Sequence, residues 1–108
     1  MIVRMWHGRV KTINAQAYRE FTIQRAIPDY QSVVGNLSVD ILERQEGEIT
    51  HFMTMTFWEN MESIKAFAGE NPELAKYYPE DKDFLLEFEK NVVHYTVVGS
   101  SRVEFQGT

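Results

Sequence analysis

Residues 37 to 60, LSVDILERQEGEITHFMTMTFWEN, hold the pattern that decides the fold. Apolar and polar residues alternate from Leu37 to Ile41, which predicts a strand with one buried face. The EGE sequence that follows places Gly47 in a tight turn, where glycine can take a positive φ angle. A second strand is expected from about residue 49 to residue 58, and Asn60 can then cap a helix. The stretch therefore predicts a β-hairpin that leads into a helix.

The first expected strand, residues 2 to 10, carries apolar side chains on both faces. Alternate residues of a strand point to opposite faces. One set is Val3, Met5, His7 and Arg9, and the other is Ile2, Arg4, Trp6 and Gly8. A face that carries Trp6, together with Phe52 and Trp58, cannot stay exposed to water. We therefore expect that face to pack against a second subunit.

A helix should follow the first strand, with Asn14 as its N-cap. Its inward stripe contains Tyr18, Phe21 and Arg25. Pro28 should kink or end the helix, because proline lacks a backbone N–H and its ring clashes with the preceding turn. A further helical turn is expected after Pro28, closed by Gly35 in a left-handed conformation.

The C-terminal half should contain two short helices and one strand. The helix after Asn60 should direct three apolar residues inward, namely Ile64, Phe67 and Ala68. A second helix is expected to begin at Pro72, with Asn71 as its cap, and to end at Pro79. Residues 91 to 98, NVVHYTVV, are the last expected strand.

The order β-α-β-β-α-β predicts an α+β fold of the ferredoxin-like type, with one antiparallel sheet and its helices on a single face. The uncovered sheet face favours a homodimer in which two sheets pack together. We expect one domain over residues 1 to 99. Residues 100 to 108 are expected to form a polar, disordered tail, and whether that tail is native is left open.

Composition limits the possible classes of protein. Apolar residues make up 44 % of the 108 residues and aromatic residues 13 %, enough for a core and for an apolar ligand site. No cysteine is present, which fits a reducing cytoplasm and leaves no thiolate for a metal site or a nucleophile. The first residues do not resemble a signal peptide, and no apolar run is long enough to span a membrane. A net charge of −5 argues against nucleic acid as a partner.

Several short motifs together resemble the antibiotic biosynthesis monooxygenase domain family. They are W-H-G at 6 to 8, F-W-E-N at 57 to 60, A-F-A-G at 66 to 69, Y-Y-P-E-D at 77 to 81 and H-Y at 94 to 95. The resemblance covers about residues 2 to 98. It implies a dimeric α+β barrel with a pocket in each subunit, between the sheet and the helices.

The family contains cofactor-independent, quinone-forming monooxygenases, haem-degrading monooxygenases and members without known activity. In the haem-degrading branch the pocket holds an Asn, a Trp and a proximal His. By alignment on the shared Trp58 motif these positions fall on His7, Phe67 and Tyr77, so all three differ here. The first expectation is therefore a cofactor-independent monooxygenase that oxidises an aromatic or polycyclic molecule with O₂. The alternatives are a haem-binding or haem-degrading protein and a non-catalytic dimer that binds a small molecule.

Three residues are the candidates for catalysis. If the family pocket lies between sheet and helices, we expect His7 to project into it and to act as a base, since imidazole exchanges protons near neutral pH. A strand histidine bonded to a neighbouring carbonyl is the alternative. Tyr77 and Tyr78 are candidates to hold a substrate oxygen. On a helix their side chains diverge by about 100°, so only one can face the pocket squarely.

A wider set of residues is expected to line the pocket, and Asp81 is expected chiefly to cap the next helical turn. The set is Phe21, Arg25, Met53, Met55, Phe67, Asp81 and His94. His94 and Tyr95 should face opposite sides of the sheet. The three histidines are too widely spaced in sequence to predict a metal site. No phosphate-binding loop is present, while flavin is left open.

Overall fold

The computed structural model describes residues 1 to 102, and its four strands form one antiparallel sheet in the order β2-β3-β1-β4. The strands are β1 (Ile2–Lys11), β2 (Asn36–Glu46), β3 (Ile49–Trp58) and β4 (Val93–Thr96). Residues 103 to 108, most of the predicted polar tail, lie outside the described residues.

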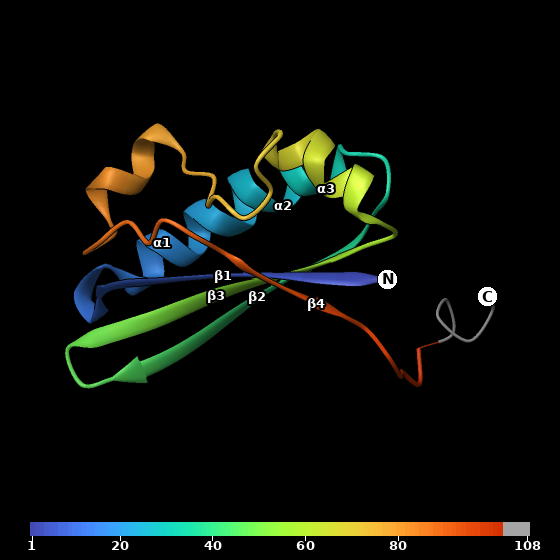
Figure 1. Ribbon diagram of the computed structural model, residues 1–108. Coiled ribbons are helices and arrows are strands. Elements are labelled where there is room, and N and C mark those ends of the chain that lie inside the picture. Colours follow the sequence, from blue (N-terminus) through green and yellow to red (C-terminus); the bar gives the residue numbers. More distant parts are fainter. Residues whose placement is uncertain (103–108) are drawn as a thin grey trace.

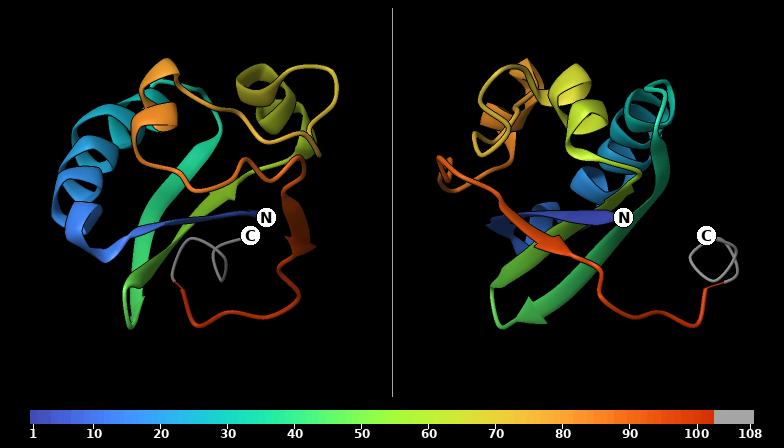
Figure 2. Two further views of the ribbon diagram at one scale, coloured as in Figure 1. Left: turned by 90° about the vertical axis from the view of Figure 1, so that its left-hand side faces the viewer. Right: turned by 45° about the vertical axis from the view of Figure 1, so that its right-hand side comes forward.

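The helices all lie on one face of this sheet, above it in Figure 1 and again on one side in both views of Figure 2. They are η1 (Thr12–Asn14), α1 (Ala15–Phe21), η2 (Thr22–Ala26), α2 (Ile27–Gln31), α3 (Met61–Ala68) and η3 (Pro79–Asp83). The predicted ferredoxin-like α+β fold is confirmed. No helix among residues 1 to 102 is both long enough and apolar enough to cross a membrane.

The hairpin and its flanking turns form as the sequence predicts. Gly47 lies between β2 and β3 with φ at 62°, and Gly35 before β2 has φ at 97°. Asn60 caps α3, because its side-chain oxygen accepts a hydrogen bond from the backbone N–H of Ser63 at 2.9 Å. These local signals therefore fix the connections on both sides of the hairpin.

Pro28 does not end the first helical segment. Residues 15 to 31 continue through a π-helical stretch, Thr22–Ala26, directly before the turn that contains the proline. Wider π turns occur as short bulges inside α-helices, and here the wider turn precedes the residue that cannot donate a backbone hydrogen bond. Asn14 precedes α1 as predicted, although its side chain makes no capping hydrogen bond.

The helix expected over residues 72 to 78 does not form. Tyr78 adopts an extended backbone, with φ at −97° and ψ at 153°, as the residue before a proline usually does. The backbone N–H of Ala75 instead donates to the carbonyl of Lys90 at 2.9 Å. This pairing holds the segment against the chain that leads into β4, and Pro79 begins η3 rather than ending a helix.

The helices cover the sheet face opposite to the one expected. Trp6 is 8 % exposed, Phe52 1 % and Trp58 0 %, and all three lie beneath the helices rather than on the bare face. The other set of β1 residues, which contains Val3, Met5, His7 and Arg9, lies on the other face. The predicted division of residues into two sets is right, but the prediction of which set meets the helices is wrong.

Two apolar clusters fill the space between sheet and helices. The first contains Trp6, Val10, Ala15, Tyr18, Phe52, Leu85 and Val92. The second contains Ala26, Tyr30, Trp58, Ile64 and Phe67. Both clusters draw on the long helical segment, so that segment is held to the sheet along its length.

The opposite sheet surface, which we call the outer face, is also largely apolar. The strand register places these apolar residues on it: Val3, Met5, Leu42, Met53, Met55, Phe57, Val93 and Tyr95. Leu42, Val93 and Tyr95 are 45 %, 52 % and 58 % exposed. Arg102 crosses one end of this surface, with its guanidinium carbon 3.9 Å from the centre of the Phe57 ring.

Candidate functional site

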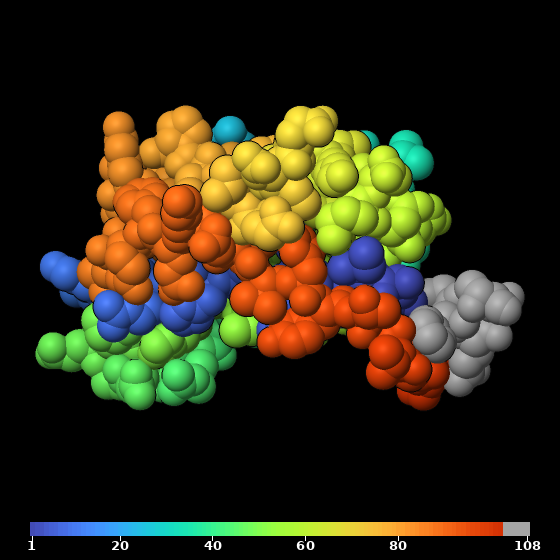
Figure 3. Space-filling view, viewed as in Figure 1, coloured from blue at the N-terminus to red at the C-terminus, as the bar shows by residue number. Residues whose placement is uncertain are grey.

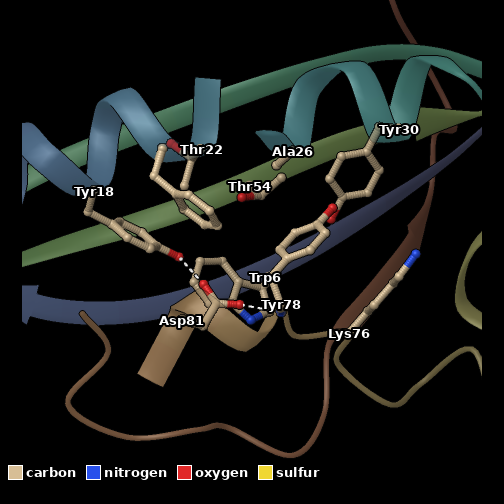
Figure 4. Close-up of a pocket in the computed structure, with 10 residues that line it drawn as sticks. Trp6, Tyr18, Thr22, Ala26, Tyr30, Thr54, Lys76, Tyr78 and Asp81 are labelled. Atoms are coloured by element: carbon tan, nitrogen blue, oxygen red, sulfur yellow. Dashed lines mark hydrogen bonds between the residues drawn. The ribbon is translucent and has the colours of Figure 1, made fainter. Parts of the chain in front are cut away.

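A small cavity lies between the helical layer and the sheet, where the resemblance implied a pocket (Figure 4). Its floor is formed by Trp6 of β1 and Thr54 of β3. One wall comes from the helical segment, through Tyr18, Phe21, Thr22, Ala26 and Tyr30. The opposite wall comes from the segment that ends in η3, through Lys76, Tyr78 and Asp81. The cavity therefore joins three parts of the chain that are distant in sequence.

The helical wall has a simple origin in the sequence. Tyr18, Thr22, Ala26 and Tyr30 are spaced four residues apart, which places them along one face of a helical segment. Figure 4 shows their side chains descending in a row toward the sheet. The two tyrosines stand at the ends of this row, and the smaller residues between them leave the space of the cavity.

Asp81 contributes a buried carboxyl group to the cavity wall. It is 3 % exposed, and one of its oxygens accepts the backbone N–H of Tyr78 at 2.6 Å. The other oxygen lies 3.4 Å from the hydroxyl of Tyr18. Burial raises the pKa of Asp81 above its usual value, since a low-polarity environment disfavours the charged form. The expected capping role is present, and the same carboxyl also faces the cavity.

The phenols around the cavity are held in their neutral form. Burial raises the pKa of Tyr18, and the nearby Asp81 carboxyl raises it further. Burial likewise raises the pKa of Tyr78, whose hydroxyl donates to Asp29 Oδ2 at 2.5 Å. Both groups are consequently hydrogen-bond donors rather than bases at neutral pH.

Polar contacts close the cavity at its solvent-facing side. Arg25 donates to Glu80 at 2.8 Å, and its guanidinium carbon lies 4.9 Å from the centre of the Tyr78 ring. The ammonium group of Lys76 is 3.5 Å from Asp29 Oδ2. Such exposed ion pairs contribute on the order of 1 kcal/mol or less each, so the stronger ties of this segment to the helices are the hydrogen bonds of Tyr78 to Asp29 and of Tyr18 to Asp81.

The enclosed volume is small. The cavity measures about 30 Å³, which is room for about one water molecule. Figure 3 shows the chain from α3 to β4, coloured yellow to orange-red, as a continuous wall along this side of the molecule. Any larger ligand must therefore displace part of the wall.

The predicted pocket residues fall into separate groups. Phe21, Tyr78 and Asp81 line the cavity, and Arg25 covers its rim through Tyr78. Tyr77 points elsewhere, since its hydroxyl donates to the carbonyl of Glu89 at 2.5 Å. The prediction that only one of the two adjacent tyrosines faces the cavity is thus correct, although no helix separates them.

Phe67 and His94 lie on the helix side of the sheet but away from the cavity. Phe67 stacks on Tyr30 with ring centres 4.3 Å apart and belongs to the core. His94 pairs with Arg4 across β4 and β1, and its Nε2 is buried without a partner among residues 1 to 102. Burial lowers the pKa of His94, and the Arg4 charge lowers it further. As predicted, Tyr95 faces the opposite side.

His7, Met53 and Met55 lie on the outer face, so the expectation that they contribute to the cavity is wrong. The reason is the reversal of the two faces, because His7 pairs with Met53 and Met5 pairs with Met55 in the register of β1 and β3. His7 instead contacts Glu89 and His51. A catalytic role for His7 stays a prediction, and its position on the outer face does not support that role.

Sequence reasoning missed several residues that form the cavity, chiefly Trp6, Tyr30, Thr54 and Lys76. The four-residue spacing from Tyr18 onward was a signal that could have found the helical wall. Trp6 was singled out but was placed on the wrong face. No local pattern points to Lys76, because its position depends on an extended segment whose pairing is not local.

Comparisons with known proteins support the fold. No protein-family profile matches the sequence, and no curated protein matches it. Among solved structures, one similar protein comes from Nitrosomonas europaea and is provisionally named an antibiotic biosynthesis monooxygenase. Its sequence is 20 % identical to this chain and its TM-score is 0.66, and the match covers 92 % of this chain and 100 % of that one. A protein from Bacillus cereus with the same provisional name has 16 % identity and a TM-score of 0.66, covering 94 % and 97 %.

A third similar structure is an arginine-to-serine variant of MhuD with two manganese protoporphyrin IX molecules bound per active site. It has 18 % identity and a TM-score of 0.61, and the match covers 94 % of this chain and 99 % of that one. At such identities the likeness is one of fold. The resemblance to antibiotic biosynthesis monooxygenase domains is confirmed at that level.

The residues of this chain do not fit a porphyrin. Ligand pockets for molecules of drug size are roughly 300–1,000 Å³, whereas this cavity measures about 30 Å³, so a porphyrin, like any ligand of that size, would have to displace the wall; the residues at the haem positions decide the fit. Tyr77, the residue that the count from the Trp58 motif assigns to the proximal-histidine position, uses its hydroxyl within the protein. Phe67 fills the core rather than the cavity. We therefore assign no chemistry through haem.

Proposed function

We propose that this protein is a small oxygenase that acts without a cofactor on a phenolic aromatic compound, held between the helices and the sheet. The observation that carries the proposal is the buried carboxyl of Asp81 in a cavity walled by aromatic rings. A carboxyl with a raised pKa in a cleft is typical of functional sites. The shared fold with provisionally named monooxygenases is consistent with this class of function.

Asp81 is the group best suited to take a proton from the substrate. Its raised pKa makes its carboxylate a stronger base than an exposed one. Tyr18 donates its hydroxyl to one carboxyl oxygen at 3.4 Å and is kept neutral by burial. Once Asp81 holds the substrate's proton, this hydroxyl can turn and donate to the substrate oxyanion. The indole N–H of Trp6 is buried without an acceptor among the described residues, which leaves it available to a ligand oxygen.

The proposed reaction needs only the substrate and O₂. Removal of a proton from an anthrone-type phenol gives an electron-rich anion, which passes one electron to O₂. The carbon radical and superoxide then combine to a peroxide anion, which takes the proton back from Asp81, and the resulting hydroperoxide loses water to give a carbonyl. One oxygen atom enters the quinone product and the other leaves as water, so a methylene group and O₂ become a ketone and H₂O. The protein supplies a base, donors for the anion and exclusion of bulk water.

Substrate entry requires the part of the wall at Lys76 and Tyr78 to move, and the hydrogen bond from Tyr78 to Asp29 must break with it. The weak exposed contacts of Lys76 and Arg25 would break first. Displacement of the Tyr78 ring would then open the cavity between Trp6 and the helical wall. A lid of this kind also closes the site to water once the substrate is bound.

We also propose that the outer face packs against a second copy of the chain. Its exposed Val93 and Tyr95 lie beside Met5 and Met55 in one apolar surface. Apolar surfaces of this kind on a single chain commonly mark protein interfaces. The homodimer proposal now rests on these residues rather than on Trp6 and Trp58.

Oxygen consumption tests the catalytic proposal. Protein freed of metal and flavin should accelerate aerobic oxidation of an anthrone-type phenol. Asp81→Asn keeps the acceptor for the Tyr78 N–H but removes the base, so it should lower the rate by about 10²–10⁴-fold. The matched control is Asp83→Asn in the same turn, where the carboxyl is exposed, and it should keep the rate.

Two outcomes would overturn parts of this proposal. If Asp81→Asn keeps full activity while His7→Gln loses it, the base assignment is wrong. If the parent protein consumes no oxygen with any phenol of a panel, the oxygenase proposal fails. The small cavity would then favour the second candidate, a non-catalytic dimer that binds a small molecule.

A further inference from the structure

The outer face contains an unbroken chain of four ionisable side chains. Glu46 Oε1 lies 2.9 Å from His51 Nε2, His51 Nδ1 lies 3.0 Å from His7 Nε2, and His7 Nδ1 lies 2.5 Å from Glu89 Oε2. The two imidazole rings are stacked with centres 5.3 Å apart. Each histidine thus uses one ring nitrogen for a carboxylate and points the other at its neighbour.

Sheet register, not sequence proximity, brings the two histidines together. His7 pairs with Met53 and Arg9 pairs with His51, so His7 and His51 are diagonal neighbours on the same face. The third histidine, His94, lies on the opposite face. The wide spacing of the histidines in the sequence therefore concealed this pair.

The protons in this arrangement do not balance for neutral histidines. Three hydrogen bonds need three protons, whereas two neutral imidazoles carry only two. When both carboxylates accept from a ring N–H, the two remaining nitrogens face each other with lone pairs. A metal ion placed between these two nitrogens would accept both lone pairs while the carboxylates hold the other ring nitrogens.

We propose that His7 and His51 form a binding site for a divalent transition-metal ion of the Zn²⁺ type. Two nitrogen ligands of tetrahedral Zn²⁺ lie about 3.3 Å apart at the usual bond lengths, and the two nitrogens here are 3.0 Å apart. Histidine ligands of metals almost always donate their other N–H to a carboxylate. Glu89 and Glu46 already hold both rings in this way.

Solvent completes the coordination in this proposal. Among residues 1 to 102 no group of three or more His, Cys, Asp and Glu side chains is arranged to hold a metal, so the chain itself supplies two ligands. An open hollow of about 230 Å³ adjoins the pair and is lined in part by Leu42, Arg44 and Met53. The proposed dimer contact on Met55, Val93 and Tyr95 leaves this hollow open, so water molecules there can take the remaining positions of the ion.

Zn²⁺ added to the metal-free, full-length protein provides the test, with ¹⁵N NMR of the histidine rings as the readout. Saturating Zn²⁺ should shift His7 Nε2 and His51 Nδ1, the two nitrogens that face each other, and should leave His94 unchanged. His51→Gln should abolish the response. Glu89→Gln keeps both ligands but loses the carboxylate that orients His7, so it should weaken Zn²⁺ binding by about 10–100-fold. His94→Gln is the matched control and should bind Zn²⁺ as the parent protein does.

The proposal is overturned if saturating Zn²⁺ leaves both nitrogens unshifted, because the pair then binds no metal ion. It is also overturned if His51→Gln binds Zn²⁺ as tightly as the parent protein. Circular dichroism of each variant shows whether it is folded. The nitrogen shifts in the unmutated protein test the ligand assignment without any substitution.

Discussion

A substitution at Gly8 tests which sheet face meets the helices. A Cβ atom added at Gly8 would lie 2.4 Å from Cη2 and 2.7 Å from Cζ2 of Trp6, and 3.0 Å from a methyl carbon of Leu85. These atoms belong to a buried ring and to the core, so the indole would have to shift. Overpacking of this kind costs about 1–3 kcal/mol. An approach of 2.4 Å to a buried ring belongs to the upper part of this range, about 2–3 kcal/mol. Alanine in a strand regains about 0.5–1 kcal/mol relative to glycine, so Gly8→Ala should destabilise the protein by a net of about 1–2.5 kcal/mol.

Thermal denaturation can measure this change. A loss of 1 kcal/mol lowers the Tm of a domain of this size by roughly 4–8 °C, so Gly8→Ala should lower the Tm by roughly 5–15 °C. Gly99→Ala is the matched control, because nothing lies within 4 Å of the added Cβ there, and its Tm should stay close to the parent value. An unchanged or higher Tm for Gly8→Ala would mean that the Trp6 ring does not cover Gly8, and the assignment of the two faces would be refuted.

Three further predictions concern acid stability, assembly and haem. Because burial raises the pKa of Asp81 in the folded chain, this group binds more proton in the folded than in the unfolded state between its unfolded pKa, about 3.9, and its folded pKa. The contribution of Asp81 to the free energy of unfolding should therefore fall as the pH rises through its folded pKa. In urea denaturation, the free energy of unfolding of Asp81→Asn should depend less steeply on pH over this range than that of the parent protein. An equal dependence on pH in the two proteins would contradict the raised pKa. Met55→Glu should convert the proposed dimer to a monomer in light scattering, and a monomeric parent protein would contradict the interface. Haemin should show no tight one-to-one Soret shift, because the Tyr77 hydroxyl is occupied; such a complex would contradict the account of the cavity.

Local signals in the sequence predict most elements of the fold. The hairpin depends on Gly47, and the start of α3 depends on the Asn60 cap, so each follows from a few neighbouring residues. The segment from residue 72 to residue 78 departs from its predicted helix, because its hydrogen bonds go to the chain before β4. Helical propensity there is outweighed by pairing between distant parts of the sequence.

The orientation of the sheet could not be read from periodicity. Strand β1 carries Trp6 on one face and Val3 with Met5 on the other, so both faces are apolar enough to be buried. The two faces differ in the size of their side chains, since the large rings of Trp6 and Phe52 fill the space under the helices. Because one inversion moves every side chain of a strand to the other face, His7, Met53 and Met55 were all misplaced together.

The measurement that tests the central proposal most directly is the position of a bound anthrone-type phenol, determined from intermolecular NOEs. We expect contacts from the ligand rings to the aromatic protons of Trp6 and Tyr78. The Tyr78 resonances should also change, because the wall of the cavity opens when the ligand binds. Asp81→Asn should keep these contacts, since it changes the base and not the cavity. Contacts to the methyl groups of Met53 and Met55 instead would place the ligand on the outer face and contradict the proposed site.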